Sequence, residues 1–502
     1  MATITVKSVL SDKTYQYVET GDPKSGTAKN VYFSPDKKYV VAIFKEKQDF
    51  NQKERLKNIV TKYLTQISTK EAGDYYLDEI YRWPTDLIES NGKTGIIVPI
   101  YNPKFFFKKG YANSDLIEGE EKNGKWFAGA KFRNKLFPLS LDQSELGKWL
   151  NYFQICVNLS RGVKKMHQMG LSHSDLSYNN VLVDPTTGSA CLIDLDGLVV
   201  PGLYPAEVIG TADFIAPEVL ASKHLSKTDP NRKLPNRLTD LHALACLIYM
   251  YLLHRHPLKG SKVHDLDTET DDLLSMGEKA LFIEHPTDHS NRPKLNQLSK
   301  WEAYWSNIDK LPYTLTGPYL KELFEMAFIK GLHNPNERPD AGMWEQALLK
   351  TTDLMQPCAN PICDQKWYVF NNTSSPRCPF CGTAHQGTLP ILDLYYQFKP
   401  TNWRPENHRL MVYKDQYLFE WHVNRNIVRN ERLTAAQKVP VGYFSFHNGK
   451  WVLVNQKLTS LKDVTENVEV PIGGMVELTD GKHILLSNED GGRLVMVTLA
   501  NK

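Results

Sequence analysis

Two carboxylates and an amide between residues 171 and 197 have the types and spacing of a site for a hard cation. Asp175 and Asn180 lie five residues apart in a polar loop. Two short apolar runs follow, joined by the turn Asp-Pro-Thr-Thr-Gly at 184–188, and they predict a hairpin that sets Asn180 beside Asp194. Phosphoryl transfer requires such a set, because the protein must hold Mg²⁺ against the phosphates and orient the attacking hydroxyl.

Two further stretches give this loop a context. Residues 173–180 read H-x-D-L-x-x-x-N, residues 210–218 read G-T-x-x-F-x-A-P-E, and residues 334–339 read N-P-N-E-R-P. Asp240 opens an apolar helix between the last two. In this order the stretches resemble the catalytic core of the eukaryotic-like protein kinases.

The resemblance implies a role for each polar residue of the core. Asp175 would orient the substrate hydroxyl and Asn180 would bind metal, while Asp194 stands where kinases carry the acid of D-F-G. Asp196 replaces the glycine of D-F-G and is expected among the cofactor-binding residues. In kinases the arginine of the late motif, here Arg338, pairs with the glutamate of A-P-E.

The same resemblance places nucleotide-binding residues near the N-terminus. A loop between two expected strands carries Gly21 and Gly26, and its backbone N–H groups could approach phosphates. The run at residues 42–45, Ala-Ile-Phe-Lys, resembles V-A-x-K and makes Lys45 the lysine that pairs with the phosphates, with Lys47 as a competitor and the cap of an exposed strand as the structural alternative. The loop departs from G-x-G-x-x-G, since Lys29 stands where the third glycine would be.

The expected partner of this lysine lies on the next helix. Residues 49–67 have helical apolar spacing, and Glu54 is the acid inside the pattern, nine residues beyond Lys45. Glu71 is the alternative partner, and a solvated helix face is the structural alternative. Residues 95–101 then predict a buried strand that enters the kinase hinge. By the resemblance, three residues there would meet the adenine: Val98, Pro99 and Tyr101.

Length and composition restrict the class of protein. With 502 residues the chain exceeds one hydrophobic core, so about two to four domains are expected. A net charge of +3, dispersed along the sequence, argues against a nucleic-acid partner. The N-terminus lacks a signal-peptide pattern, and no apolar run reaches the roughly 18 residues of a membrane helix. A cytoplasmic protein without a membrane partner is therefore expected.

Seven cysteines divide into two groups. Three lie singly in apolar stretches, and the other four form C-x4-C and C-x2-C pairs separated by fourteen residues. Paired thiolates on two knuckles supply the four soft ligands of a tetrahedral zinc, and a closed site of this kind is structural. Four free core cysteines are the alternative. The expected ligands are Cys358, Cys363, Cys378 and Cys381.

The last segment, 389–502, has strand-like runs with turns between them, which suggests a β-sandwich. The expected strands include 417–423, 442–446, 450–455 and 483–486. From Gly449 onward the segment resembles a forkhead-associated domain. Residues 439–442, Val-Pro-Val-Gly, stand where such domains carry the serine and basic residues that hold phosphothreonine, so a degenerate interaction module is expected.

The expected fold is α+β: a two-lobed kinase, a zinc ribbon and a β-sandwich. The predicted domains are the N-lobe at 1–101, the C-lobe at 102–356, the ribbon at 357–388 and the sandwich at 389–502. This order resembles the bacterial kinases of tellurite-resistance-type phosphorylation triads. The resemblance implies two partners, a von Willebrand A-type protein and a metal-dependent protein phosphatase.

Three functions are compatible with these residues. The first is a Ser/Thr protein kinase that transfers the γ-phosphate of Mg·ATP to a partner protein and to itself. The second is a pseudokinase scaffold, and the third is a small-molecule phosphotransferase. Arg338 and the A-P-E segment favour a protein substrate, and Thr211 is typical of Ser/Thr specificity. The intact acids and amide of the core argue against a pseudokinase, while Ser177 departs from the usual catalytic-loop lysine.

The residue before the catalytic aspartate bears on regulation. Kinases switched by activation-loop phosphorylation carry an arginine there, and this chain has Ser174. A neutral hydroxyl cannot make a bidentate pair with a phosphate, so activity without loop phosphorylation is expected. Segment 104–140 has no assignable function, and 221–239 is expected to be a solvated loop, with partner docking as the alternative.

Overall fold

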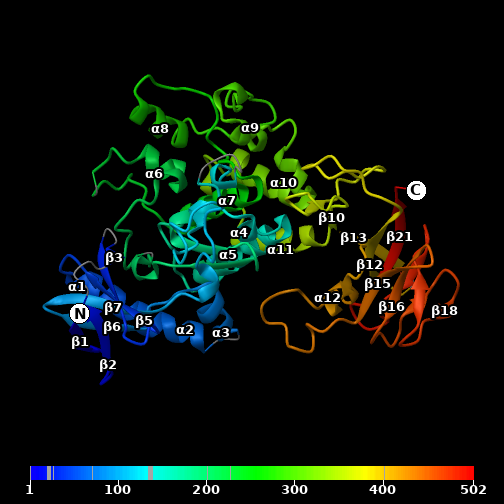
Figure 1. The fold of residues 1–502 in the computed structure, drawn as a ribbon, viewed down its shortest axis with the longest axis horizontal. Coiled ribbons are helices and arrows are strands. Elements are labelled where there is room, and N and C mark those ends of the chain that lie inside the picture. The colour runs from blue at the N-terminus through cyan, green and yellow to red at the C-terminus, as the bar shows by residue number, and fades with distance from the viewer. Residues whose placement is uncertain are drawn as a thin grey trace. The chain divides into compact units, whose positions relative to one another are not determined.

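The computed structural model describes residues 2–19, 24–25, 28–69, 72–133, 139–200, 202–226, 228–400 and 402–501. The chain divides into two compact units (Figure 1). The first unit consists of Met1–Gly147, Gln154–Asp309 and Glu322–Glu345. The second unit consists of Lys148–Phe153, Lys310–Lys321 and Gln346–Lys502, so the predicted domain boundary after residue 356 lies within it. The four predicted domains remain predictions at that level of detail.

The first unit begins with strands. The hairpin of β1 (Ala2–Lys7) and β2 (Thr14–Glu19) is followed by an antiparallel sheet in the order β3-β4-β5-β7-β6. Its strands are β3 (Lys24–Ser25), β4 (Lys29–Phe33), β5 (Tyr39–Phe44), β6 (Asp86–Ser90) and β7 (Lys93–Pro99). The turn between β4 and β5 is held by the Ser34 hydroxyl, which accepts hydrogen bonds from the N–H groups of Lys38 and Tyr39.

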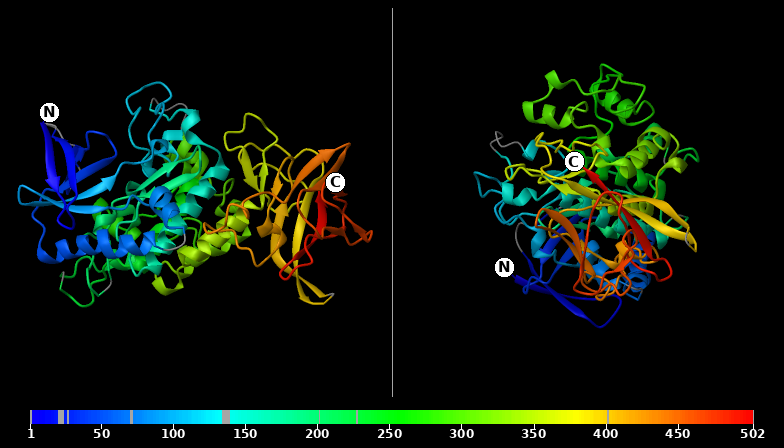
Figure 2. Two further views of the ribbon diagram at one scale, coloured as in Figure 1. Left: turned by 90° about the horizontal axis from the view of Figure 1, so that it is seen from below. Right: turned by 90° about the vertical axis from the view of Figure 1, so that its right-hand side faces the viewer.

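One helical segment packs on this sheet and is drawn in blue beside it in the left view of Figure 2. It consists of α1 (Phe50–Asn58), a π-helical turn (Ile59–Tyr63) and α2 (Leu64–Ser68), so the predicted helix is confirmed. Asp49 caps its start by accepting from the Gln52 N–H. Leu56 and Val60 pack with Phe44 in one apolar cluster.

Helices make up most of the rest of the first unit. They are α3 (Gly73–Tyr75), α4 (Gln143–Leu146), α5 (Trp149–Gln168), α6 (Pro217–Ala221), α7 (Arg237–Leu253), α8 (Thr268–Met276), α9 (Lys300–Ser306), α10 (Pro318–Glu325) and α11 (Ala341–Thr352). Of these, α5, α10 and α11 have residues in both units. From Thr239 to Leu253, α7 is buried along its whole length, and the side chain of Asn236 caps its start. The hairpin of β8 (Val181–Asp184) and β9 (Ser189–Leu192) lies within this part of the chain and confirms the predicted turn.

The second unit is rich in strands. A short hairpin joins β10 (Met355–Pro357) to β11 (Trp367–Val369). A six-stranded sheet has the order β13-β12-β21-β20-β17-β18, and a four-stranded sheet has the order β14-β15-β16-β19. Residues of both sheets share one apolar core, among them Leu392, Val495, Phe444 and Leu453. Figure 2 draws these strands in yellow to red.

Three of the four expected strands, 442–446, 450–455 and 483–486, lie within one residue of the observed bounds. The strands of these two sheets are β12 (Leu389–Lys399), β13 (Asn402–Met411), β14 (Tyr417–Leu418), β15 (Gly442–His447), β16 (Lys450–Asn455), β17 (Lys462–Asp463), β18 (Val468–Glu469), β19 (Met475–Glu477), β20 (His483–Leu485) and β21 (Arg493–Ala500). The strand predicted at 417–423 is wrong beyond Leu418, because Glu420–Val423 form the helical turn α12. The rings of Phe419 and Trp421 stack there at 4.3 Å, and the Phe419 N–H donates to the His422 ring.

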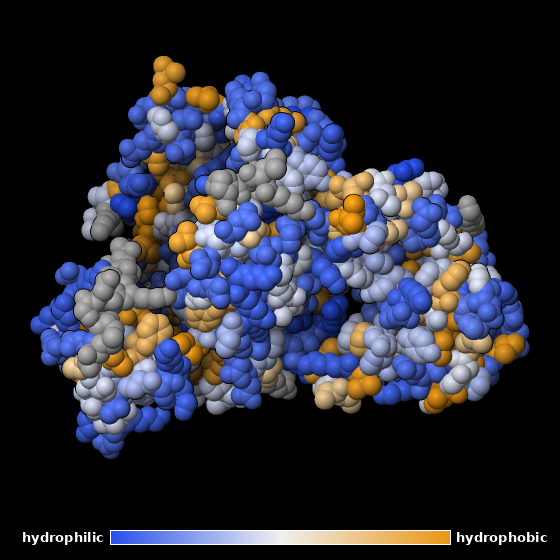
Figure 3. Space-filling view, viewed as in Figure 1, coloured by the Kyte–Doolittle hydropathy of each residue, from blue (hydrophilic) through white to orange (hydrophobic). Residues whose placement is uncertain are grey.

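One face of the molecule shows how polar and apolar residues are distributed on it. Hydrophilic residues predominate on the face drawn in Figure 3, and apolar residues lie in small groups. Among the helices that the described residues form, none is long and apolar enough to cross a membrane.

Candidate active site

The hairpin β8–β9 brings the predicted catalytic residues together. The Asn180 side-chain amide donates to the main-chain oxygen of Asp175 at 2.8 Å and to its carboxylate at 3.0 Å. The main-chain oxygen of Asn180 accepts from the Ile193 N–H at 3.1 Å, one residue before Asp194. Asp175, Asn180 and Asp194 therefore line one end of the hairpin, because the turn at 184–188 folds the second strand back on the first.

Asp175 is held from a second side by the segment 197–218, which by the resemblance corresponds to the activation segment of kinases. Its Oδ1 accepts from the N–H of Thr211 at 2.7 Å and from the Thr211 hydroxyl at 2.8 Å. That hydroxyl also lies 3.1 Å from the hydroxyl of Ser177. Since Asn180 contacts the other carboxylate oxygen, Asp175 is fixed in one orientation before any substrate arrives.

Asp240 of α7 holds the backbone of the loop that carries Asp175. Its carboxylate is 2% exposed and accepts from the N–H groups of His173 at 2.8 Å and Ser174 at 3.1 Å. Ser174 has a φ of 68°, in the left-handed region that a serine rarely adopts. The sequence placed Asp240 at the start of a helix and gave it no further role. Its contacts show that it positions the backbone just before Asp175.

The late arginine pairs with the glutamate of the A-P-E segment, as the resemblance implied. Arg338 donates from both terminal nitrogens to the Glu218 carboxylate, at 2.9 and 2.8 Å. It also donates to the main-chain oxygen of Leu238 at 2.9 Å. The bidentate pair joins α6 to the start of α7 and to the chain before α11, which fixes the floor of the site.

Lys29, to which the sequence analysis assigned no role, forms ion pairs with two acids of the site. Lys29 Nζ is 2.6 Å from a carboxylate oxygen of Asp194 and 2.6 Å from one of Asp196. The Asp194 side chain is 52% exposed, whereas that of Asp196 is 10% exposed. The signal available in the sequence was the lysine in place of the third glycine.

The charges in this group influence one another. Burial disfavours the charged form of Lys29, but Asp196 and Asp194 outweigh it and raise the pKa of the ammonium. Burial also opposes the charge on Asp194, yet Lys29 outweighs it and the pKa of Asp194 is lowered. For Asp196, burial prevails over the attraction of Lys29 and the pKa is raised. The charges of Lys29 and Asp194 therefore stabilise each other, whereas burial and the neighbouring Asp194 disfavour the charge of Asp196.

The other predicted nucleotide residues are placed less closely together. Lys45 follows the last residue of β5, and its N–H donates to the main-chain oxygen of Ala28. Glu54 lies 3.8 Å from Lys57 on its own helix. Gly21, Gly26 and Glu71 lie outside the described residues. The roles predicted for Lys45 and Glu54 remain predictions.

The expected adenine region lies where β7 leaves the sheet. Pro99 is the last residue of β7 and pairs with Tyr39, and Val98 packs against the apolar cluster beneath the sheet. Tyr101 packs against a cluster that contains Leu182 and Ile193 of the catalytic hairpin. The end of β7 and the catalytic hairpin thus both present apolar side chains here.

The activation segment contacts the helix α1. The Glu207 carboxylate accepts from the guanidinium of Arg55 at 2.5 Å and from the Gln52 amide at 3.1 Å. One turn further, the Asn58 amide donates to the Tyr204 hydroxyl at 2.9 Å. The Arg55 side chain is 7% exposed, so Glu207 supplies a counter-charge to a nearly buried cation. The sequence did not single out this pair.

The four cysteines predicted as metal ligands converge in the second unit. Their Sγ atoms all lie within 4.8 Å of one another. Cys358 and Cys381 are 3.5 Å apart, and Cys363 and Cys378 are 3.9 Å apart. These separations are too long for disulfides, whose sulfurs lie about 2 Å apart. The cluster is therefore four free thiols that face a common centre.

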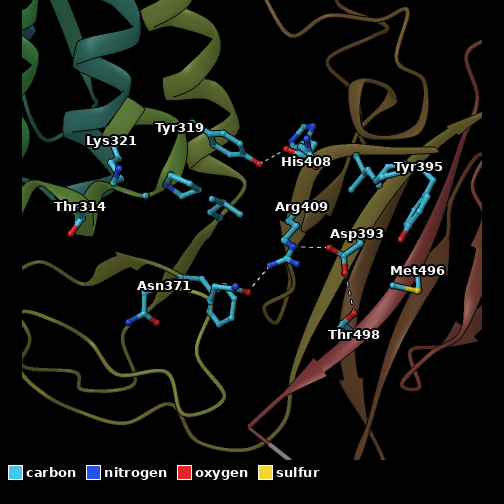
Figure 4. Close-up of a pocket in the computed structure, with 18 of the residues that line it drawn as sticks. Thr314, Tyr319, Lys321, Asn371, Asp393, Tyr395, His408, Arg409, Met496 and Thr498 are labelled. Carbon is cyan, nitrogen blue, oxygen red and sulfur yellow. Dashed lines mark hydrogen bonds and ion pairs between the residues drawn. The ribbon is translucent and has the colours of Figure 1, made fainter. Parts of the chain in front are cut away.

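A cavity of about 810 Å³ lies within the second unit. Its walls come from residues 314–321 and from strands β12, β13 and β21 (Figure 4). The Asp393 carboxylate accepts from Arg409 at 2.6 Å and from Thr498 at 3.0 Å, and Arg409 also donates to Asn372 at 2.7 Å. These charged side chains neutralise each other inside the cavity.

Comparison with known proteins gives a family match over the part of the chain that contains the predicted catalytic residues. The protein kinase domain family matches residues 139–311. The Ser/Thr-protein kinase ppk21 of Schizosaccharomyces pombe is 26% identical over 169 residues, covering 29% of each chain. The probable Ser/Thr-protein kinase RTK1 of Saccharomyces cerevisiae is 28% identical over 173 residues, covering 33% of this chain and 23% of its own. The solved kinase domain of a Toxoplasma gondii specific rhoptry antigen has 16% identity and a TM-score of 0.37, covering 57% of this chain and 84% of its own.

These matches have a definite extent. The chain spans less than a third of the length of the curated relatives it matches. Residues 139–311 match the protein kinase domain family and are similar in sequence to parts of fungal Ser/Thr protein kinases. The matched stretch contains Asp175, Asn180, Asp194 and the A-P-E segment.

Proposed function

We propose that the first unit is an active Ser/Thr protein kinase that transfers the γ-phosphate of Mg·ATP to a partner protein and to itself. The observation that carries the proposal is the fixed Asp175, which Asn180 and Thr211 hold from two sides at 2.7 to 3.0 Å. A carboxylate held in this way can orient a substrate hydroxyl and accept its proton as the phosphate bond forms.

The remaining residues of the site have complementary roles. The Asn180 and Asp194 oxygens would hold Mg²⁺, whose charge would offset that of the phosphates. The Asp194 side chain is 52% exposed, so its carboxylate is accessible to a metal ion. Val98, Pro99 and Tyr101 would contact the adenine.

A protein substrate is favoured over a small molecule. The Arg338–Glu218 pair stiffens the segment that follows Thr211, the floor on which kinases bind a peptide. Thr211 contacts Asp175 directly, an arrangement typical of Ser/Thr kinases. A pseudokinase scaffold remains the second candidate, since Ser177 replaces the catalytic-loop lysine.

Incubation of the pure full-length chain with labelled ATP and a mixed protein substrate tests the proposal. We expect label on serine and threonine, and a loss of about 1,000-fold in the Asp175→Ala variant, because the positioned base is removed. Asp265→Ala, which removes an exposed carboxylate, should behave as wild type. Equal background incorporation by wild type and Asp175→Ala would favour the pseudokinase.

The thiol cluster fits a structural zinc ion. Zn–S bonds of about 2.3 Å in a tetrahedron place the sulfurs about 3.8 Å apart. The pairs Cys358–Cys381 and Cys363–Cys378, at 3.5 and 3.9 Å, match this edge. With four thiolates the ion has no open position, so it would stabilise the segment 357–388 and take no part in catalysis.

The partners follow from domain order. A kinase, a four-cysteine segment and a two-sheet domain in sequence support a cytoplasmic kinase of a tellurite-resistance-type triad, acting with a von Willebrand A-type protein and a metal-dependent phosphatase. The two-sheet domain would be a degenerate forkhead-associated module, because residues 439–442 lack the serine and basic residues that hold phosphothreonine. Titration with phosphothreonine peptides should show no binding.

A further inference from the structure

Lys29 and Lys45 start from opposite faces of the five-stranded sheet of the first unit. In the register of β4 and β5, Lys29 pairs directly with Phe44, and the next rung joins the Lys45 N–H to Ala28. Directly opposed residues share a face, and successive residues alternate. Lys29 and Phe44 therefore point one way and Lys45 points the other.

The apolar clusters identify the two faces. Val31, Ala42 and Phe44 pack with Leu56 and Val60, on the side of the sheet that faces the helix and the cleft. On the other face of β5, a separate cluster contains Val41, with Ile43 packed against it, and Val6 and Tyr17 of the hairpin β1–β2. By the same alternation, Lys45, one residue beyond the end of β5, starts from the face of Ile43.

The position on β5 that faces the cleft is thus apolar. Phe44 lies two residues after Ala42, where V-A-x-K has its lysine, and it packs against the helix. The cation is on the neighbouring strand, with Lys29 Nζ 5.6 Å from the centre of the Phe44 ring. An ion pair between strand and helix is replaced here by an apolar contact, and Glu54 pairs within its own helix.

We infer that Lys29 of β4, rather than Lys45, is the lysine that binds the phosphates of the nucleotide. The inference rests on the proposed kinase function. It is carried by the position of Lys29 Nζ, 2.6 Å from both Asp194 and Asp196, the acids beside which the metal and phosphates would lie. When nucleotide binds, the ammonium has only to turn from carboxylate oxygens to phosphate oxygens.

This arrangement alters how the five-stranded sheet contributes to the site. Lys29 takes the position of the third glycine of the usual phosphate loop. Its side chain reaches the two acids from strand β4. A flexible four-carbon stem with a point charge suits a phosphate that moves during transfer. Ser177 adds no charge to the catalytic loop, so the Lys29 ammonium, which contacts both acids, would supply positive charge beside the phosphates.

Two single variants of the full-length chain separate the lysines. Lys29→Met should lower the rate of transfer to a peptide by at least about 100-fold, the loss typical of one electrostatic group. It should also weaken binding of Mg·ATP by about tenfold or more, since a charge-assisted contact is lost. Lys45→Met should change either quantity by less than about threefold, as should Lys93→Met, which alters an exposed lysine at the start of β7.

A relocated lysine gives a second readout. In Lys29→Ala/Phe44→Lys, the new lysine side chain starts from a Cβ about 5 Å from that of residue 29, because the two residues are directly opposed in the ladder. We expect it to recover at least about tenfold of the activity lost in Lys29→Ala. Circular dichroism and thermal unfolding show whether each variant is folded.

The outcomes distinguish this inference from the proposed function. If Lys45→Met loses transfer and nucleotide binding while Lys29→Met keeps both, the inference is wrong and the kinase function stands. Tighter nucleotide binding by Lys29→Met would also overturn it, because Lys29 would then block the cleft. A folded double variant that stays as inactive as Lys29→Ala counts against it as well. Wild-type protein that binds nucleotide through Lys29 but transfers no phosphate would support the inference and remove the proposed function.

Discussion

The two units of the chain gather polar side chains in opposite ways. In the first unit, Lys29 meets Asp194 and Asp196 from 165 and 167 residues away in the sequence, and the Asp194 side chain stays 52% exposed. In the second unit, four thiols meet within a span of 23 residues around a common centre. There Asp353, 11% exposed, lies between the rings of His408 and His422.

The difference shows what each cluster is arranged to do. Asp194 is exposed and paired with Lys29, so both side chains can exchange each other for a substrate or a metal ion that arrives. Closed groups that satisfy one another hold the chain in place. A change in the first unit should therefore remove activity and spare the fold, and a change in the second should do the reverse.

The largest expected effect is on the acids of the cleft. Asp194→Asn should reduce phosphoryl transfer by about 1,000-fold, because the exposed carboxylate proposed to hold Mg²⁺ becomes a neutral amide. Asp196→Asn should keep more activity, since burial already raises the pKa of Asp196 and disfavours its charge. Initial rates with saturating Mg·ATP measure both, and thermal unfolding should change little. Equal inactivation would indicate that both acids hold metal.

The reciprocal change is in the thiol cluster. Cys378→Ser should lower bound zinc from one per chain to near zero and open residues 357–388 to protease, because metal binding supplies the folding energy of so small a segment. Transfer to a short peptide should stay within about twofold. Atomic absorption and limited proteolysis give the readouts, with Cys156→Ala, a buried cysteine outside the cluster, as control. Loss of catalysis in step with zinc would contradict the separation of the two units.

A smaller effect is expected where the activation segment meets α1. Glu207→Gln should lower the rate by about three- to tenfold, because Arg55 loses a charged partner worth about 1 kcal/mol. Glu207 already supplies a negative charge, and the neutral Ser174 cannot pair with a phosphate group on the activation segment. Phosphatase-treated enzyme should therefore keep its rate. Glu89→Gln, which breaks an exposed pair between Lys53 and β6, is the matched control. A large drop restored by preincubation with ATP would overturn this expectation.

The smallest effect concerns Asp353. Burial opposes its charge, but His422 and His408 outweigh it and lower the pKa of Asp353. A carboxylate with a lowered pKa stabilises the fold above its unfolded pKa of about 4, and this contribution is lost as the pH falls below that value. Asp353→Asn should therefore destabilise the second unit by about 1 to 3 kcal/mol at pH 7. It should also weaken the pH dependence of the unfolding temperature of this unit between about pH 4 and 2.

Differential scanning calorimetry across this pH range measures the effect. Asp415→Asn removes an exposed carboxyl of the same unit and should leave the profile unchanged. An unchanged profile in Asp353→Asn would show that the two histidines are held by other contacts. Kinase activity at neutral pH should be the same in both variants.

The sequence was most informative where structure is local. The hairpin that joins Asn180 to Asp194 is set by a five-residue turn, and the helix at 49–67 by apolar spacing, so both could be predicted. The four thiols were likewise predictable, because their spacing in the chain already matches two knuckles.

Contacts between distant segments were less accessible. Lys29 appeared in the sequence only as a departure from a glycine pattern, since its partners lie far along the chain and the pairing depends on the register of β4 with β5. The Arg55–Glu207 pair requires the same kind of long-range information. The helical turn at Glu420–Val423 was missed because aromatic residues favour strands, and here the stacking of Phe419 on Trp421 outweighed that preference.

The position of Lys29 between the two acids has a thermodynamic consequence. In the nucleotide-free protein a tethered ammonium occupies the oxygens to which a divalent cation would bind, so magnesium alone must compete with it. A nucleotide offers the ammonium another anion and releases the carboxylates. Magnesium and nucleotide should therefore each increase the affinity for the other by the same factor, as linkage requires. Free magnesium would then bind the resting cleft weakly, and the complex of metal and nucleotide would bind as one ligand.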